Sequence, residues 1–365
     1  SMSGAVVATP SVDAHWTFSD VASRLPASED PSAQLRLVHG TVEVEGKVTM
    51  ADAGVVEGSV LTLVRCGRSL GVVTASLDGA VKIWSVDTFG CWKTLPAHRA
   101  PVRSAVLSPD GTRLLTASAD RSAKIWSTKS GECIRTLQGH ERSVMSAVFS
   151  PDGASILTAS SDWTAKLWNA ETGACLQTLH HQDEIFSAVF APHGSSVLTA
   201  SVDGTARMWS LQSGLCLESF EGYGARIYSA MFSPDCTSVL TSSVDGTATI
   251  WSATAGDCLR SLHGHEDEVL SAVFSPDGAL ALTASVDETA RLWHAACGVC
   301  IRSLEGHEDV VYSAVFSPDG ALICTASRDG TARLWHTDSG KCVATLEGHG
   351  DAVICASFGW IDMCD

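Results

Sequence analysis

Short apolar runs separated by turn residues recur along most of the chain. In one clear stretch, apolar residues fill 269–274 and 279–285, a third run ends at Trp293, and a fourth covers 300–304. The sequence Ser-Pro-Asp-Gly at 275–278 separates the first two runs and is typical of a tight turn. Each run has the length of a β-strand, and none has the length or period of a helix. This stretch therefore predicts a four-stranded antiparallel meander.

The same unit repeats every 41 or 42 residues. Its clearest marker is the tryptophan that ends the third run: Trp84, Trp126, Trp168, Trp209, Trp251, Trp293 and Trp335. A period of this size indicates a propeller or solenoid built from one small unit. A single four-stranded sheet cannot cover both its faces, whereas radially stacked copies bury both and leave only short sheet edges. The repeat therefore predicts an all-β propeller.

Thirteen cysteines are present, and seven of them repeat with the same period: Cys91, Cys133, Cys175, Cys216, Cys258, Cys300 and Cys342. Equivalent positions of successive units lie too far apart for disulfides, so we expect free thiols buried as small apolar groups in a reducing cytosol. Cys297 and Cys300 form one C-x-x-C pair, which without a second pair is a weak sign of zinc. We expect no metal site and no cofactor.

The repeats resemble the WD-repeat family of β-propellers. Gly-His pairs recur at Gly139-His140, Gly264-His265, Gly306-His307 and Gly348-His349, and the family's aromatic residue ends the third strand. The resemblance covers about residues 55–358. It departs from the family in one respect, since Ser, Asn or His follows each tryptophan where the family has Asp.

The resemblance implies a hydrogen-bonded tetrad of His, Ser, Asp and Trp in five units. The members are His98, Ser118, Asp120 and Trp126; His140, Ser160, Asp162 and Trp168; His181, Ser201, Asp203 and Trp209; His265, Ser285, Asp287 and Trp293; and His307, Ser327, Asp329 and Trp335. A buried indole N–H needs an acceptor, which a Ser–His–Asp chain would supply. Fivefold repetition with a Trp partner and no oxyanion hole speaks against a catalytic triad. Val56 and Tyr223 replace the histidine in the first and fifth units, which we expect to be weaker.

The number of blades depends on the two ends of the chain. Seven units span residues 55–346, yet residues 353–358 repeat the first strand of an eighth. Residues 27–39 imitate the second turn and third strand of a unit, with Val38 in place of the tryptophan. We therefore expect eight four-stranded blades in one domain of residues 12–365, the last built from about 18–53 plus 352–359. Seven blades with an N-terminal appendage is the alternative, and residues 1–11 are expected to be a flexible tail with a possible tag remnant.

Comparison of the repeats with one another separates constant columns from variable ones. The second residue of the first strand varies in size and charge, while its neighbour is almost always serine. In the family this variable column lies at the mouth of the central channel, and the turns after the second strand lie nearby. We therefore expect partner-binding residues at Arg103, Met145, Phe186, Tyr228, Tyr312, Arg328 and Trp163. Arginines and aromatics are the composition of an interface hot spot, although some of these side chains could simply fill the channel.

Charge is unevenly distributed over the same face. Acidic residues precede the first strands of the fourth, sixth, seventh and eighth units: Asp183, Glu184, Glu266, Asp267, Glu268, Glu308, Asp309 and Asp351. Arginines gather in the second and third units: Arg99, Arg103, Arg121 and Arg142. This division favours a partner of mixed charge with its basic segment over the acidic sector, and a solvated charged rim is the alternative.

The overall composition narrows the class of function. The net charge is −17 and no apolar stretch approaches the ~20 residues of a membrane span, so we expect neither nucleic acid nor membrane as partner. No nucleotide loop, metal cluster or nucleophile motif is present. We therefore expect a non-catalytic, cytoplasmic scaffold that binds a protein or peptide, most simply as a monomer or as one domain of a longer protein. A reader of a basic or modified tail, with an aromatic cage, is the alternative, and an enzyme is the least favoured.

Overall fold

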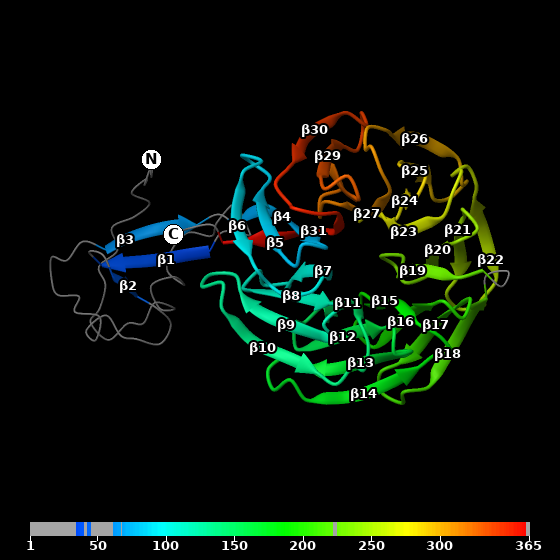
Figure 1. The fold of residues 1–365 in the computed structure, drawn as a ribbon, viewed down its shortest axis with the longest axis horizontal. Coiled ribbons are helices and arrows are strands. Elements are labelled where there is room, and N and C mark those ends of the chain that lie inside the picture. Colours follow the sequence, from blue (N-terminus) through cyan, green and yellow to red (C-terminus); the bar gives the residue numbers. More distant parts are fainter. Residues whose placement is uncertain (1–33, 40–41, 45–60, 67, 222–224, 363–365) are drawn as a thin grey trace. The chain divides into compact units, whose positions relative to one another are not determined.

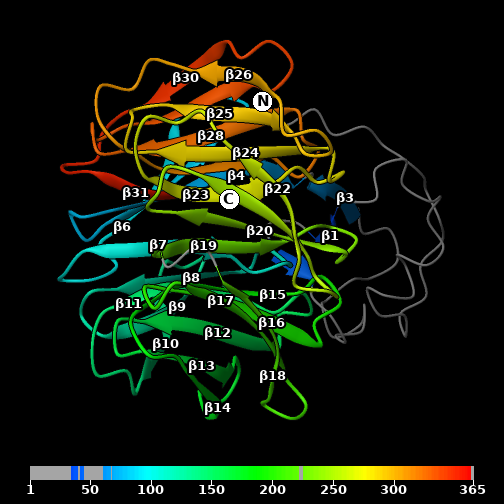
Figure 2. The ribbon, with the colours of Figure 1, turned by 90° about the vertical axis from the view of Figure 1, so that its right-hand side faces the viewer.

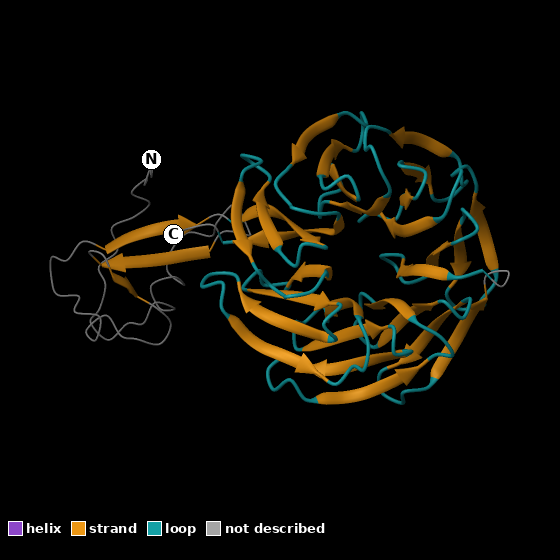
Figure 3. Cartoon of the chain, viewed as in Figure 1, coloured by secondary structure: helices purple, strands orange, loops and turns teal. Residues whose placement is uncertain are grey.

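The computed structural model describes residues 34–39, 42–44, 61–66, 68–221 and 225–362 (Figure 1). These residues belong to two compact units, one of residues 1–69 with 362–365 and one of residues 70–361, each of which is described by itself. Strands are the regular elements of both (Figure 3). The part of the chain so described contains no helix long and apolar enough to cross a membrane.

The larger unit is a ring of seven four-stranded antiparallel sheets, the blades (Figure 1). Blade 1 has the order β31-β4-β5-β6, and blades 2 to 7 follow the chain as β7–β10, β11–β14, β15–β18, β19–β22, β23–β26 and β27–β30. The first strand named for each blade lies nearest the centre of the ring. Figure 2 shows β7, β19 and β23 crossing the thickness of the ring.

The strands of each position have similar lengths in all blades. The inner strands are β31 (Val353–Ile361), β7 (Val102–Leu107), β11 (Val144–Phe149), β15 (Ile185–Phe190), β19 (Ile227–Phe232), β23 (Val269–Phe274) and β27 (Val311–Phe316). The second strands are β4 (Ser69–Ser76), β8 (Arg113–Ser118), β12 (Ser155–Ser160), β16 (Ser196–Ser201), β20 (Ser238–Ser243), β24 (Leu280–Ser285) and β28 (Leu322–Ser327). The third strands are β5 (Val81–Ser85), β9 (Ser122–Ser127), β13 (Thr164–Asn169), β17 (Thr205–Ser210), β21 (Ala248–Ser252), β25 (Ala290–His294) and β29 (Ala332–His336). The outer strands are β6 (Cys91–Leu95), β10 (Cys133–Gln138), β14 (Cys175–His180), β18 (Cys216–Glu221), β22 (Cys258–Leu262), β26 (Cys300–Leu304) and β30 (Cys342–Leu346).

The core lies between neighbouring blades, which explains the apolar runs of the second strands. Every residue of β16 is buried, because both faces of this strand are covered. In the core between blades 2 and 3, Leu115 and Ile125 of one sheet pack with Ile156 and Trp168 of the next. Burial of this kind contributes about 1.5–3 kcal/mol for each large apolar side chain, so the blades stabilise one another.

Each inner strand of blades 2 to 7 contains a β-bulge at its second residue. In blade 3, Val144 pairs with Ser160 and Ser146 pairs with Ala159, which leaves Met145 as the extra residue. The equivalent residues of the other blades are Arg103, Phe186, Tyr228, Leu270 and Tyr312. A bulge frees one residue from the ladder and re-aims its side chain. The column that varies between repeats is therefore the column that the backbone releases from the sheet.

The C-terminal strand closes the ring, but not as we predicted. β31 pairs with β4 and supplies the inner strand of blade 1, so the ring has seven blades and the prediction of eight is wrong. The alternative of seven blades with an N-terminal appendage is confirmed. In the register of the repeat, residues 61–66 correspond to the inner strand of the first unit, but they form β3 and pair with β1 instead. The inner position of blade 1 is taken by β31, whose apolar sequence is equivalent to those of the other inner strands.

The smaller unit contains a three-stranded antiparallel sheet of β1 (Gln34–His39), β2 (Val42–Val44) and β3 (Leu61–Cys66), in the order β2-β1-β3. The predicted closing blade drew on residues 18–53 of this unit. Residues 18–33, 40–41 and 45–53 lie outside the described residues, and the strands that are described pair with one another rather than with β31. The tail predicted at residues 1–11 also lies outside the described residues.

The seam between blades 1 and 2 offers a test of closure at Gly111, in the turn after β7. Gly111 has φ +72°, and a Cβ there would collide with the backbone oxygen of Trp360 in β31. Gly153 occupies the equivalent turn of blade 3 with φ +69°, but its Cβ would meet the flexible tip of Arg113 and, at an ordinary contact distance, the ring of Pro109. Both alanine variants carry the left-handed backbone cost of about 1–2 kcal/mol. We expect Gly111→Ala to cost a further 1–3 kcal/mol or so in unfolding free energy, because β31 must shift.

The measurement is urea unfolding of the two variants beside the unchanged protein. Equal losses for Gly111→Ala and Gly153→Ala would contradict the placement of β31 at this seam.

Candidate functional site

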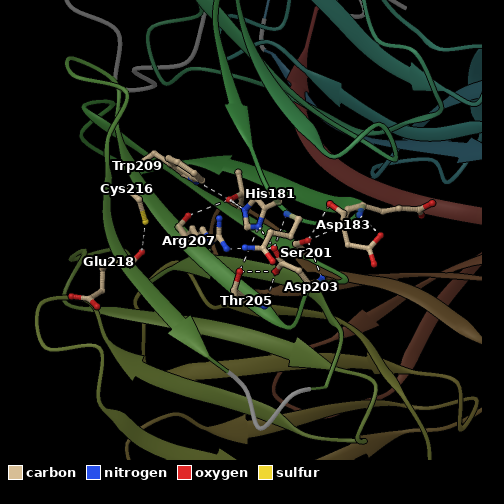
Figure 4. Close-up of polar contacts among 12 residues, drawn as sticks. His181, Asp183, Ser201, Asp203, Thr205, Arg207, Trp209, Cys216 and Glu218 are labelled. Atoms are coloured by element: carbon tan, nitrogen blue, oxygen red, sulfur yellow. Dashed lines mark hydrogen bonds and ion pairs between the residues drawn. The ribbon is translucent and has the colours of Figure 1, made fainter.

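A hydrogen-bonded chain runs from the tryptophan of a blade to the loop before its inner strand. In blade 4, shown in Figure 4, Trp209 Nε1 donates to Thr199 Oγ1 at 2.8 Å. Thr199 Oγ1 lies 2.7 Å from His181 Nε2, and His181 Nδ1 lies 2.9 Å from Asp203 Oδ2. The chain thereby joins β16, β17, the loop before β15 and the turn after β16.

The acceptor of the indole N–H is a threonine, not the serine that we predicted. Ser201, two residues further along, instead donates to the Glu184 carbonyl and accepts the backbone N–H of Asp203. It lies at the end of its strand, where its hydroxyl reaches the loop, whereas Thr199 lies deeper, beside the indole. The same correction applies to Ser118, Ser160, Ser285 and Ser327, each of which bonds a loop carbonyl. A sequence signal existed, because threonine recurs ten residues before every one of the seven tryptophans.

The Trp–Thr–His–Asp chain recurs around the ring. Its Trp, Thr, His and Asp members are Trp126, Thr116, His98 and Asp120; Trp168, Thr158, His140 and Asp162; Trp293, Thr283, His265 and Asp287; and Trp335, Thr325, His307 and Asp329. In these four blades the His–Thr and His–Asp distances are 2.7 or 2.8 Å. The histidine, aspartate and tryptophan assignments are therefore those predicted.

Blade 1 is complete because its histidine comes from the other end of the chain. His349 Nε2 lies 2.7 Å from Thr74 Oγ1, and its Nδ1 lies 3.2 Å from Asp78 Oδ2. Trp84 donates to the same threonine at 2.8 Å. The prediction that Val56 replaces this histidine is wrong, because the loop that precedes β31 supplies it.

Blade 5 has a shorter chain. Trp251 donates to Thr241 at 2.8 Å, and Thr241 donates to the Thr249 carbonyl, as Thr199 does to the Arg207 carbonyl, but no histidine of the described residues bonds Thr241. Tyr223, the predicted replacement for the histidine, lies outside the described residues. Asp245, the equivalent of the tetrad aspartates, is exposed. That blade 5 is a weaker unit than the others stays a prediction.

The charges of the network follow from burial and hydrogen bonding. Burial by itself would raise the pKa of Asp203, but bonds from Thr205, His181 and the Gln182 N–H outweigh it and lower the pKa to about 2. Burial lowers the pKa of His181 against the opposing effect of Asp203. His181 is therefore neutral at pH 7, with Nδ1–H donating to Asp203 and Nε2 accepting from the Thr199 hydroxyl.

This arrangement is suited to structure rather than to catalysis. Thr199 is 0% exposed and His181 7%, so no substrate reaches the hydroxyl that a triad would use as nucleophile. The threonine oxygen already accepts the indole N–H. Catalysis of the Ser–His–Asp type needs an accessible nucleophile, and these networks do not provide one.

The predicted partner-binding residues of the inner strands are half-buried at their bulges. Phe186 and Tyr228 lie on adjacent strands, with ring centroids 5.2 Å apart in an edge-to-face arrangement. The Tyr228 hydroxyl donates to Glu268 Oε2 of the next blade at 2.7 Å. Burial and this bond raise the pKa of Tyr228 to about 12. Three neighbouring blades therefore meet in one aromatic and acidic cluster.

The other predicted site residues are not part of this cluster. Tyr312 lies on β27, two inner strands beyond Tyr228, and its ring contacts no other aromatic ring of the described chain, so Phe186, Tyr228 and Tyr312 do not converge into a cage. Arg328 forms an exposed ion pair with Asp309 at 3.8 Å. Trp163 is 46% exposed in the turn after β12.

The repeated cysteines are exposed, so the prediction of buried thiols is wrong. All seven begin outer strands, where a second β-bulge follows; in blade 4 the thiol of Cys216 donates to the Glu218 carbonyl at 3.3 Å (Figure 4). The thiol thus serves as a weak donor to backbone that the bulge displaces. Cys297 and Cys300 are free and exposed, and the described residues contain no group of three or more ligands arranged for a metal ion.

The threonine assignment can be tested by comparing blades 4 and 5. Thr199→Val leaves two buried groups without a hydrogen-bond partner, the Trp209 N–H and His181 Nε2. Thr241→Val leaves only the Trp251 N–H without one. At about 1–3 kcal/mol for each unsatisfied group, we expect roughly twice the loss of unfolding free energy for Thr199→Val, measured in urea. Ser201→Ala leaves the chain intact and should cost less than Thr199→Val. A larger loss for Ser201→Ala would restore the serine as the acceptor.

The network also predicts how stability depends on pH. Burial lowers the pKa of His98, His181, His307 and His349 below their ordinary 6.5. Below about pH 6.5 the histidines of the unfolded chain are protonated while those of the folded chain are still neutral. The unfolding free energy therefore falls as the pH drops through this range. The aspartates, with lowered pKa values, add a second loss below about pH 4. A melting temperature that stays constant from pH 7 to pH 5 would show that the folded histidines take up protons as the unfolded ones do, which would contradict their lowered pKa values.

Two family models match the chain. One is described as the first β-propeller of IFT122 and matches residues 69–295; the other is described as WD domain, G-beta repeat and matches residues 298–336. No curated protein matches the chain. The first match covers more than half of the residues, including blades 2 to 5 in full. The chain therefore belongs to the family of the IFT122 first β-propeller, a family of WD-repeat β-propellers.

Proposed function

We propose that this protein is a non-catalytic scaffold that binds a segment of a protein partner at one mouth of its central channel. WD-repeat propellers are typically scaffolds of protein interaction, and the tetrads offer no accessible nucleophile. The partner-binding mouth is the one formed by the bulged ends of the inner strands. A cytoplasmic location is part of the proposal, because the eight exposed free thiols of the described residues suit a reducing compartment.

The bulges are the observation that carries this proposal. The same backbone device recurs on six inner strands and each time releases one side chain from the sheet. The released residues nevertheless differ from blade to blade in size and charge. A side chain that only filled the channel would have the same volume in every blade, as the neighbouring serine does. A binding surface needs side chains of different size and charge.

The acidic sector supports a basic segment as the part of the partner that lies there. Glu268 accepts from Tyr228, so a carboxylate lies within the aromatic cluster itself. Asp183, Glu184, Asp267 and Asp309 lie before the inner strands of blades 4, 6 and 7 and are exposed or half-buried. Lysine or arginine side chains of a partner would meet both carboxylates and aromatic rings in this region.

Three truncations test the site. Phe186→Ala, Tyr228→Ala and Tyr312→Ala together should weaken binding of the partner by about 2–4 kcal/mol, as the loss of hot-spot aromatics does. The partner is captured with the unchanged protein from cells of its source, identified by mass spectrometry, and then titrated against purified variants by calorimetry.

The chain offers a matched control on its circumference. Leu176, Leu217 and Ile301 are also bulge residues and are exposed, but they lie on outer strands. Their triple alanine variant should bind as the unchanged protein does. If the control loses binding and the inner variant keeps it, the site lies on the rim and the channel-mouth proposal is withdrawn.

A further inference from the structure

In the turn between the second and third strands, three blades have a residue with a side chain where the other four have glycine. Arg121, Trp163 and Glu288 have φ of 72°, 71° and 68°, in the turns after β8, β12 and β24. The equivalent residues of the other blades are Gly79, Gly204, Gly246 and Gly330. The turns are otherwise the same, since the N–H of Trp163 bonds the Ser160 carbonyl just as that of Gly204 bonds the Ser201 carbonyl. Left-handed backbone is strained for residues with a Cβ, so these three side chains are kept at a cost.

Nothing inside the described chain compensates for that cost. Arg121 and Glu288 are exposed and Trp163 is 46% exposed. None of the three side chains makes a hydrogen bond, ion pair or ring contact with the residues that the structure describes. No polar or aromatic contact within the described chain therefore accounts for these three side chains.

The first two of these turns lie in neighbouring blades beside further arginines. In blade 2, Arg99 follows His98, whose ring bonds Asp120, the residue before Arg121. In blade 3, the carbonyl of Arg142 accepts from Ser160 in the turn that carries Trp163. Arg99 and Arg142 are both exposed.

The exposed arginines of blades 2 and 3 form no ion pair with the described residues, unlike three arginines of the later blades. Arg207, Arg291 and Arg328 each form an ion pair with an aspartate of their own blade, at 3.6 to 4.0 Å. The side chains of Arg99, Arg121 and Arg142 have no such partner among the described residues. Arg103, at the bulge of blade 2, has a buried Nε without a hydrogen-bond partner. Blades 2 and 3 thus carry exposed arginines without ion pairs in the same loops and turns as an exposed indole.

We propose that these two strained turns form a contact site for an acidic segment of a protein partner, with an apolar side chain of that segment resting on Trp163. The inference rests on the proposed function and adds the orientation of the partner: its acidic part lies over blades 2 and 3, and its basic part over blades 4, 6 and 7. Guanidinium groups bind carboxylates with paired hydrogen bonds, and arginine with tryptophan is typical of interface hot spots. A nucleic acid fits less well, because its uniform negative charge would meet the acidic sector across the ring.

The test uses glycine variants, which remove the side chain and relieve the strain together. The probe is a fluorescein-labelled peptide of eight glutamates followed by Leu-Phe, titrated at low salt. We expect the Arg121→Gly, Trp163→Gly double variant to bind the probe at least tenfold more weakly than the unchanged protein. Its melting temperature should be the same or higher, because the turn adopts its conformation more easily with glycine.

Glu288→Gly is the matched control. It relieves the same strain in blade 6, within the acidic sector, and should leave binding of the acidic probe unchanged or stronger. Unchanged binding by the Arg121→Gly, Trp163→Gly variant would overturn the inference, as would a fall in its melting temperature, which would show that the side chains act within the fold. Tighter binding of a single-stranded oligonucleotide than of the peptide would assign the site to nucleic acid and also overturn it.

The outcomes separate this inference from the channel-mouth proposal. If the glycine variants still bind the acidic probe while the inner aromatic truncations abolish binding of the captured partner, the channel-mouth proposal is supported and the acidic contact site is refuted. If the glycine variants no longer bind the probe while the aromatic truncations still bind the partner, the acidic contact site is supported and the channel-mouth proposal is refuted.

Discussion

The buried tryptophan of each blade imposes the constraint on which the rest of the propeller depends. Its indole packs into the core shared with a neighbouring blade, as Trp168 does with Leu115 and Ile125 of blade 2. The N–H of such a ring has lost its water and needs an acceptor inside the protein. The threonine hydroxyl that accepts this hydrogen bond must in turn donate one, and it donates to a neutral histidine that an aspartate holds in place. One apolar contact between blades thereby fixes the loop and turn at the mouth of the channel.

The same constraint explains how the two ends of the propeller meet. Blade 1 has a tryptophan and a threonine but no histidine of its own, and His349 supplies the missing ring from 275 residues away. The strand that follows, β31, brings Val353 and Ala356 into the core with Trp84. Closure therefore satisfies an apolar and a polar requirement together. Blade 1, which combines strands from distant parts of the chain, keeps the ring closed while its apolar core and its hydrogen-bonded network are both intact.

The sequence predicted the parts of the fold that depend on local patterns, and failed where pairing between distant segments decides. The tryptophan period and the Ser-Pro-Asp-Gly turns were enough to predict four-stranded blades and the His, Asp and Trp members of the networks. The partner of β31 was not predictable, because residues 61–66 and 353–361 are both apolar enough to be an inner strand and only one is paired with β4. Threonine was missed because serine and threonine face the same side of the second strand and differ in depth. The exposure of the cysteines depends on a bulge that only the paired register shows.

A repeated scaffold also makes departures from the repeat informative. The interblade cores and the networks recur with little change, so most of the folding free energy is independent of the side chains at the mouth. Strain at single positions can then be tolerated, because one unfavourable turn is small beside seven cooperating blades. Bulges release Phe186 and Tyr228 without strain, whereas Arg121 and Trp163 occupy left-handed backbone at a cost. Positions of both kinds lie at the same end of the blades, where the core constrains the side chains least. The side chains at this end can therefore differ between blades and determine which partner binds.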